Sequence, residues 1–224
     1  MSKHMQRDLE KLQKSILRMA SLVEEAVFQA AQALQTRDTD LADRVIEGDN
    51  LIDLLENEVH EECLKILALH QPVAVDLRRI SSVLFISTNL ERMGDYATAI
   101  AERVPGLAKP PLVAIPERLK PMTERTILMV RKALDAFVNS DAATARTVIR
   151  LDDEVDADNA TIIREIVAEM KRVADHIEPL LSLFSAVRHV ERIADHATNI
   201  SEDVIYLVEG AIVRHHHELL EPQS

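Results

Sequence analysis

Two twelve-residue stretches of this chain nearly repeat each other: NLERMGDYATAI at residues 89–100 and HVERIADHATNI at residues 189–200. They lie 100 residues apart and share glutamate, arginine, aspartate, alanine, threonine and isoleucine at six matched positions. A single Glu-x-x-x-Asp is common in an acidic, helix-rich chain. Its recurrence at the same place in two halves predicts that one structural unit is used twice, with the same acidic pair in each copy.

The composition is typical of an all-α protein. Apolar residues make up 47% of the 224 positions, aromatic residues only 3%, and there are just four glycines, while leucine, alanine, glutamate and arginine are residues that favour helices. The net charge of −12 argues against nucleic acid as a partner, because phosphate backbones are bound through lysine and arginine, and equally against an anionic bilayer. It suits cations or basic protein surfaces.

A single cysteine, Cys63, excludes a disulfide framework and indicates a reducing compartment; we expect it to be a small buried apolar residue. The N-terminus mixes charges and lacks the apolar core of a signal peptide. No apolar run approaches the roughly 20 residues that span a membrane. The sequence therefore predicts a soluble cytoplasmic protein.

Prolines divide the chain. Four of the eight lie between residues 105 and 116, and because proline lacks an amide proton and clashes with the preceding turn, we expect no helix to cross this stretch. Apolar spacing of three to four residues predicts helices elsewhere. The expected helices are residues 5–35, 41–69 and 74–103 in the first half and 117–138, 142–174 and 180–213 in the second, with Pro179 in the break before the last.

Each set of three amphipathic helices can bury its apolar stripes mutually. We therefore predict two tandem three-helix bundles related by a pseudo-twofold. The predicted boundaries are residues 1–104 for the first bundle, 105–116 for the linker, 117–213 for the second bundle and 214–224 for a polar tail. Exposed faces on such long helices also suggest a homodimer.

A second acidic pair precedes the first in each half. The segments VIEGDNLID and VIRLDDEVD, at residues 45–53 and 148–156, align so that two aspartates coincide. A spacing of four places both carboxylates of a pair on one helix face, about 5–6 Å apart at Cβ. If neighbouring helices bring the pairs together, each half has four carboxylates at one place. The eight residues are Asp49, Asp53, Glu91, Asp95, Asp152, Asp156, Glu191 and Asp195.

Such a concentration of oxygen ligands predicts a metal site for a hard ion such as magnesium, manganese, calcium or iron, with zinc also possible. On a helical wheel the carboxylates of residues 91 and 95 face away from the apolar stripe, so we expect the site on the outer surface of each bundle. His60 could add a nitrogen ligand, and the histidines at 215–217 a separate site. The small residues Gly48, Gly94 and Ala194, each before an aspartate, would allow close approach.

These motifs resemble the PhoU family of bacterial phosphate-signalling regulators. The resemblance covers nearly the whole chain and is carried by VIEGDNLIDLLENEV, QPVAVDLRRI, NLERMGDYATAI and HVERIADHATNI. It implies two three-helix bundles, iron or zinc on the acidic motifs of some members, and repression of the phosphate-starvation response. It also implies two partners, a membrane sensor histidine kinase and the ATPase of the phosphate ABC transporter. The protein would associate with the membrane only through these partners.

Two other functions remain open from the residues. A metalloenzyme such as a di-iron oxidase would use Glu-x-x-His pairs pointing into the bundle core, but no glutamate of this chain has histidine three positions later. A helical adaptor without any ion would need none of the acidic motifs. We expect a non-enzymatic regulator that binds metal.

Overall fold

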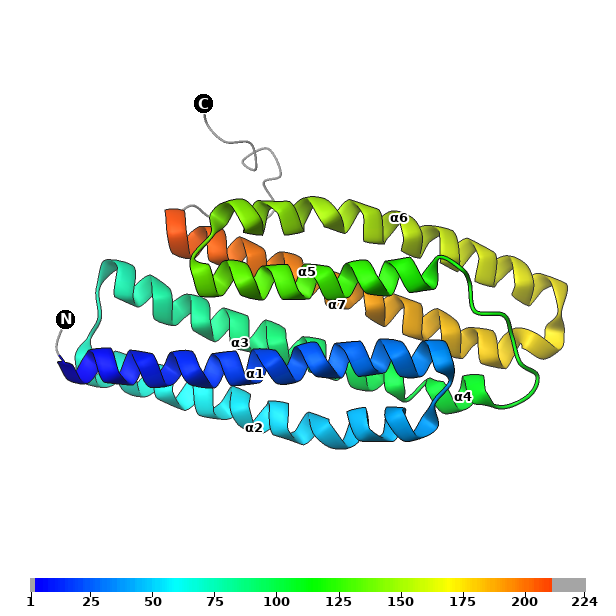
Figure 1. Ribbon diagram of the computed structural model, residues 1–224, viewed down its shortest axis with the longest axis horizontal. Helices are drawn as coiled ribbons and strands as arrows, with labels where there is room; N and C mark the ends of the chain where they lie inside the picture. Colours follow the sequence, from blue (N-terminus) through cyan, green and yellow to red (C-terminus); the bar gives the residue numbers. More distant parts are fainter. Residues whose placement is uncertain (1–2, 211–224) are drawn as a thin grey trace, which may run out of the picture.

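The computed structural model describes residues 3–210, and almost all of them are helical. The first half contains α1 (Lys3–Thr36), α2 (Thr39–His70) and α3 (Ala74–Ala101), and the second contains α5 (Leu119–Asn139), α6 (Ala142–Arg172) and α7 (Ile177–Glu209). Two short elements join them, α4 (Val104–Ala108) and the 3-10 helix η1 (Ala174–His176). The long helices run along one axis as two three-helix bundles (Figure 1). The predicted all-α fold with an internal repeat is confirmed.

The ends of the helices follow from local sequence. Asp38 caps α2 by accepting a hydrogen bond from the Leu41 amide, and Asp141 caps α6 by accepting from the amides of Ala143 and Thr144. Left-handed residues end helices at Gln71, Ser140 and Gly210. The chain therefore reverses in the gaps that separate the predicted helices, at residues 36–40 and 139–141.

No helix crosses residues 105–116, as expected, and the expectation about the start of the last helix was wrong in detail. The linker does contain a helical turn, because α4 begins at Val104 with Pro105 in its first turn. The last helix begins at Ile177, so that Pro179 lies inside it and the break falls at η1. In both places proline occupies the first turn, where its missing amide proton has no intrahelical partner to lose. The predicted end of the last helix at residue 213, the polar tail and the three histidines lie outside the described residues.

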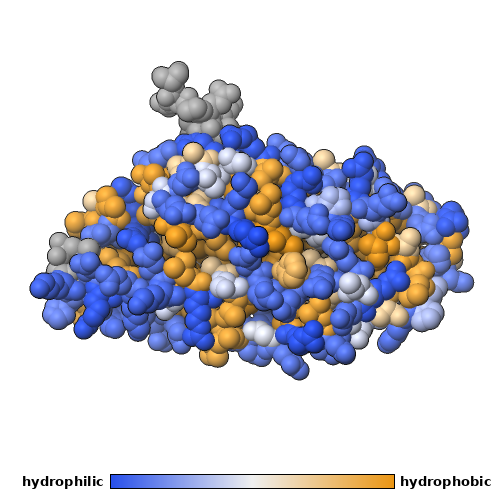
Figure 2. All heavy atoms as spheres, viewed as in Figure 1, coloured by the Kyte–Doolittle hydropathy of each residue, from blue (hydrophilic) through white to orange (hydrophobic). Residues whose placement is uncertain are grey.

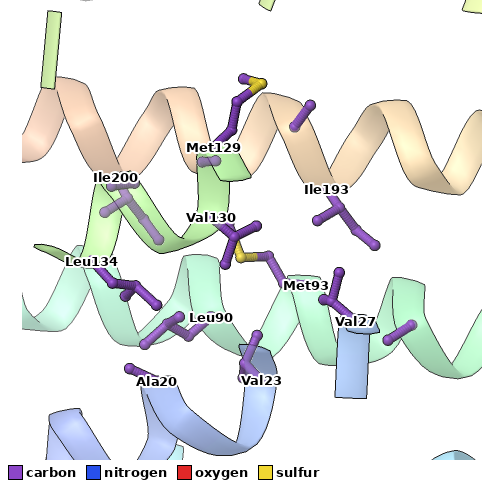
Figure 3. Packing of buried hydrophobic residues seen from close by; sticks show 14 of the residues in the cluster. Ala20, Val23, Val27, Leu90, Met93, Met129, Val130, Leu134, Ile193 and Ile200 are labelled. Carbon is purple, nitrogen blue, oxygen red and sulfur yellow. The ribbon is translucent and has the colours of Figure 1, made fainter. Parts of the chain in front are cut away.

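The two bundles share one hydrophobic core. Its buried side chains come from every long helix and form a continuous cluster. At the boundary between the halves, Val23 and Val27 of α1 and Met93 of α3 face Val130 of α5 and Ile193 of α7 (Figure 3). Cys63 is fully buried in this core, as expected. The inner helices α1, α3, α5 and α7 thus join the halves, while α2 and α6 lie on the outside (Figure 1).

Contacts between α3 and α7 show how the halves are related. Asn89 of α3 accepts a hydrogen bond from His196 of α7 at 2.7 Å, and Tyr96 of α3 stacks on His189 of α7 with ring centroids 5.6 Å apart. Positions 89 and 189 correspond in the repeat, as do 96 and 196. The two contacts are therefore the same pair of positions with the halves exchanged, so the helices are antiparallel about a local pseudo-twofold.

The surface of the molecule is mainly polar. In the view of Figure 2 hydrophilic residues dominate, and apolar residues appear in patches between them. Several large apolar side chains are well exposed, among them Phe28 of α1 at 49% and Leu54 and Leu64 of α2 at 61% and 62%. Such residues are what the expected homodimer would need, and the homodimer stays a prediction.

Candidate metal centres between neighbouring helices

The four predicted carboxylates of the first half come from α2 and α3 and influence one another electrostatically. Burial raises the pKa of Asp49, and the charges of Asp53 and Asp95 raise it further. Burial likewise raises the pKa of Glu91 to about 7, with Asp95 next in effect and smaller contributions from Glu56 and Asp53. These carboxylates on two different helices repel one another and form one electrostatic cluster. We call Asp49, Asp53, Glu91 and Asp95 the first cluster.

An arginine partly neutralises the first cluster, and polar side chains contact the neighbouring Glu56. The Arg92 guanidinium lies 3.5 Å from Oε2 of Glu91 and 3.1 Å from Oδ2 of Asp95. The Thr88 hydroxyl donates to Oε1 of Glu56 at 3.1 Å. Nε2 of His60 lies 3.6 Å from the same oxygen and 3.1 Å from the Ser87 hydroxyl. His60 is thus at the edge of the cluster, where it was expected as an additional ligand.

The second half reproduces this arrangement between α6 and α7. Burial raises the pKa of Asp152 to about 7, followed in effect by the charges of Asp195 and Asp156. Burial also raises the pKa of Asp195 to about 6, with Glu191 as the next cause. Arg188 lies 3.0 Å from Oε1 of Glu191. These four carboxylates form the second cluster. Carboxylates from two helices therefore influence one another in each half, while their action as one metal site stays a prediction.

Burial is uneven within the two clusters. The carboxylates do avoid the apolar core, but the Glu91 and Glu191 side chains are only 19% and 13% exposed, whereas Asp95 is 40% exposed. Asp53, Asp156 and Asp195 are exposed, so the carboxylates face the surface of each bundle, while the metal site itself stays a prediction. The adjacent helix covers each groove, and removal from water is the main cause of the raised pKa values.

One of the small residues explains how α2 and α3 come so close. A Cβ atom on Gly94 would lie 3.1 Å from Cδ1 of Ile52 and 3.2 Å from Oδ1 of Asp49. The predicted close approach is thus real at Gly94. It is wrong at Gly48, where a Cβ would meet nothing within 4 Å. The second half has a fully buried Ala194 at the matching position.

A polar contact between α3 and α7 was not revealed by the sequence. Tyr96 lies between His189 and His196, with both ring centroids at 5.6 Å, and the Arg192 guanidinium sits 5.6 Å from the Tyr96 ring centre. Burial and nearby arginines lower the pKa of both histidines, so both are neutral at pH 7. The only signal in the sequence was the exchange of tyrosine and histidine at positions 96 and 196.

The donor chemistry of both grooves fits a hard cation. The donors are carboxylate oxygens, and Oε2 of Glu191 is buried without a hydrogen-bond partner among the described residues. A cation would satisfy such oxygens. Among the described residues, however, no three His, Cys, Asp or Glu side chains are placed so that they could hold a metal as they stand. Binding requires side-chain rotation and displacement of the arginines, and metal ligation by the eight residues stays a prediction.

Comparison with known proteins identifies the family. The model of the PhoU domain matches residues 16–104 and again residues 119–204, which are the two bundles. The chain belongs to the PhoU family. A crystal structure of PhoU from Pseudomonas aeruginosa superimposes with a TM-score of 0.89 at 39% identity, covering 92% of this chain and 99% of that one. The regulatory protein PhoU of the phosphate transport system from Streptococcus pneumoniae gives 0.87 at 31%, covering 93% and 99%.

Curated PhoU proteins align over nearly all of this chain. The phosphate-specific transport system accessory protein PhoU homolog of Pseudomonas putida is 42% identical over 93% of this chain and 82% of its own length. That of Aquifex aeolicus is 40% identical over 94% and 96%. The resemblance inferred from the motifs is confirmed. Within residues 3–210, no helix is long and apolar enough to cross a bilayer.

Proposed function

We propose that this PhoU protein is a non-enzymatic accessory and regulator of the phosphate-specific transport system. The curated relatives carry that accessory role in their names. In this proposal the chain represses the phosphate-starvation response when phosphate is plentiful. It acts in the cytoplasm as a homodimer and contacts a sensor histidine kinase and the ATPase of the phosphate ABC transporter. It meets the membrane only through these partners.

We further propose that each acidic cluster holds a metal ion, with iron, zinc, manganese or magnesium as candidates. The observation that supports this most directly is the repeated convergence of four carboxylates, two from each of two helices, in a groove that raises the pKa of Glu91 and Asp152 to about 7. Mutual repulsion of this kind is relieved by a bound cation. The ion would neutralise the groove and orient the flanking arginines, and no chemical conversion is assigned to it.

Metal content and partner binding test the two parts separately. Elemental analysis of protein purified without added metal should find a divalent ion, and the variant Asp95→Asn with Asp195→Asn should lose it. A pull-down with the cytoplasmic region of the kinase should weaken in the same variant. The matched control is Asp135→Asn with Asp175→Asn, which changes two exposed aspartates outside the clusters. Unchanged metal content and unchanged kinase binding in the cluster variant would remove the acidic motifs from the mechanism.

An adaptor without metal is the second candidate, and one observation favours it. In the structure Arg92 bridges Glu91 and Asp95, and Arg188 pairs with Glu191, so internal cations already offset part of each cluster. If the protein works in this way, purified protein contains no stoichiometric metal, and chelation leaves kinase binding unchanged.

A further inference from the structure

The connection between α2 and α3 carries several exposed apolar side chains. Val73 and Leu69 are the two most exposed large apolar residues of the described chain, at 75% and 66%. Val75 and Leu77 follow them in the sequence and are 59% and 42% exposed. The connection lies at one end of the molecule, beside the N-terminal end of α1 (Figure 1). Contiguous apolar side chains on a surface mark interaction sites. We call these four residues the α2–α3 tip.

The internal repeat provides a control for the tip, because the second half makes the same connection between α6 and α7. In the register of the acidic pairs and of α3 and α7, the four tip residues correspond to Arg172, Val173, Asp175 and Ile177. Arg172 and Asp175 are charged, and Val173 is half-buried. The bundle therefore does not require an apolar surface at this connection, and the tip needs another explanation.

The backbone of the tip also differs from that of its counterpart. Gln71 ends α2 with φ at 45°, and Ala74 opens α3 with φ at 49°. Residues with a Cβ atom seldom adopt this left-handed conformation. In the second half Val173 has φ at −134°, and none of residues 171–177 has a positive φ. Strained conformations concentrate at sites of function, and here they hold apolar side chains in solvent.

Two arginines follow the tip on α3. Arg79 is exposed and donates to the side-chain oxygen of Gln13 at 3.1 Å, not to a carboxylate. Nε of Arg78 is buried without a hydrogen-bond partner among the described residues. The corresponding residues of the second half are Glu178 and Pro179. The cationic groups, like the apolar ones, are thus particular to the first half.

Acidic side chains near the tip are engaged within the protein. Asp8 of α1 lies 2.9 Å from His70, and Glu62 of α2 lies 3.5 Å from Lys65. Asp76 stands in the first turn of α3, where the helix dipole favours a carboxylate. The net charge of −12 opposes an anionic bilayer. A protein pocket with an apolar floor and a rim of carboxylates would match both the tip and the arginines beside it.

We propose that the α2–α3 tip inserts into an apolar pocket, rimmed by carboxylates, on the ATPase of the phosphate ABC transporter. This inference rests on the proposed function. The transporter is preferred to the kinase because the curated relatives are named for the phosphate-specific transport system. The left-handed turn presents the apolar side chains, and Arg78 and Arg79 meet the carboxylates at the rim.

The test measures binding of the full-length protein to the purified ATPase by biolayer interferometry. Val75→Asp makes the first half match position 175 of the second. It should weaken binding by roughly tenfold or more, because a carboxylate would enter an apolar pocket with an acidic rim. Aspartate is favoured in the first turn of a helix, so the free energy of unfolding in urea should not fall. The matched control is Leu181→Asp, which changes an apolar side chain of the second half that is 54% exposed and should leave binding unchanged.

Charge supplies a second readout. Arg79→Glu should slow association with the ATPase and reduce the dependence of the association rate on salt, because the arginine would attract the acidic rim before contact. Arg79→Gln removes the charge without reversing it and should have the smaller effect. Equal association rates in the wild type and Arg79→Glu would contradict the acidic rim.

The outcomes separate the tip from the proposed function. Equal ATPase affinity in the wild type and Val75→Asp, or equal weakening by Leu181→Asp, would overturn the tip and leave the accessory role intact. Loss of kinase binding instead of ATPase binding in Val75→Asp would do the same.

Two other occupants are tested with the same variant. Flotation of the wild type, but not of Val75→Asp, with vesicles of phosphatidylethanolamine and phosphatidylglycerol would assign the tip to a membrane. A change of oligomeric state in Val75→Asp, measured by analytical ultracentrifugation, would assign it to the homodimer. Either result would overturn the ATPase as the occupant. A wild type that binds neither ATPase nor kinase would refute the proposed function together with the tip.

Discussion

Gly94 allows α2 and α3 to pack closely, and the consequence of filling its space can be estimated. A Cβ at this position would meet Cδ1 and Cγ2 of Ile52 at 3.1 and 3.3 Å and Oδ1 of Asp49 at 3.2 Å. Overpacking of a core typically costs about 1–3 kcal/mol. Alanine in place of glycine inside a helix returns about 0.5–1 kcal/mol. We therefore expect Gly94→Ala to lower the free energy of unfolding by about 1 kcal/mol.

The second half shows how the same contact accommodates a methyl group. There Ala194 replaces glycine, and Val155 occupies the place of Ile52 in the repeat, with both residues fully buried. Compared with the first half, the second half has one methylene group more at position 194 and one fewer at position 155. Ile52→Val alone should cost about 1 kcal/mol. The double variant should nevertheless lie within about 0.5 kcal/mol of the wild type, because valine lacks the Cδ1 atom that meets the new methyl group. This gives a coupling energy of about 2 kcal/mol.

Urea unfolding followed by circular dichroism measures all four free energies of this cycle. Gly48→Ala is the matched control, since a Cβ there meets nothing within 4 Å; it should raise the free energy of unfolding by about 0.5–1 kcal/mol through helix propensity alone. If the Gly94 and Ile52 changes prove additive, the two residues do not share the space that the structure assigns to them. Stabilisation by Gly94→Ala equal to that of Gly48→Ala would refute the close approach.

Three further predictions address charge and burial. First, folding raises the pKa of Glu91 and Asp152 to about 7 and of Asp195 to about 6. Between about pH 4 and 7 the folded state therefore binds more protons than the unfolded state. The free energy of unfolding of metal-free protein consequently falls as pH rises. After discounting for solvent screening we expect the free energy of unfolding to fall by about 2 kcal/mol across this window in urea titrations. The fall should be smaller in the double variant Glu91→Gln with Asp152→Asn. Equal pH dependence in the wild type and the double variant would contradict this prediction. Second, Asp158 accepts hydrogen bonds from Arg118 at 3.1 Å and Arg125 at 2.7 Å, and its side chain is only 13% exposed. Asp158→Ala should therefore lower the free energy of unfolding by about 2 kcal/mol in thermal or urea unfolding. An unchanged midpoint would show that both arginines are equally well solvated without Asp158. Third, Cys63 is fully buried and its pKa is raised to about 12 by burial, so a thiol reagent should label it only as fast as the protein unfolds; rapid labelling of native protein would refute its burial.

Most of the fold could be predicted from the sequence because the decisive signals are local. The three-to-four-residue apolar spacing defines the six long helices, and capping residues such as Asp38 and Asp141 define where two of them begin. The repeat then fixes which helices correspond. Proline was the exception, since its effect depends on position within a helix: Pro105 and Pro179 both stand in a first turn, where the residue is tolerated.

The candidate site could be predicted only in part. Spacing of four fixes the face that Glu91 and Asp95 occupy on α3, but the depth of the groove depends on how closely α2 packs, which spacing does not contain. The contacts of Tyr96 could not be predicted from the sequence, for a stronger reason. Its neighbours His189 and Arg192 lie about one hundred residues away in the chain, and their meeting depends on the register between α3 and α7.

The antiparallel pairing of α3 with α7 has a consequence for how such a protein could diversify. Two separate half-length chains, associating through the same helix, would present an identical residue at each matched position, so tyrosine on one side could never face histidine on the other. Fusion into a single polypeptide removes that constraint. Each half of one polypeptide can change alone, and the pairing of Tyr96 with His189 and of Asn89 with His196 uses that freedom at the contact between the halves.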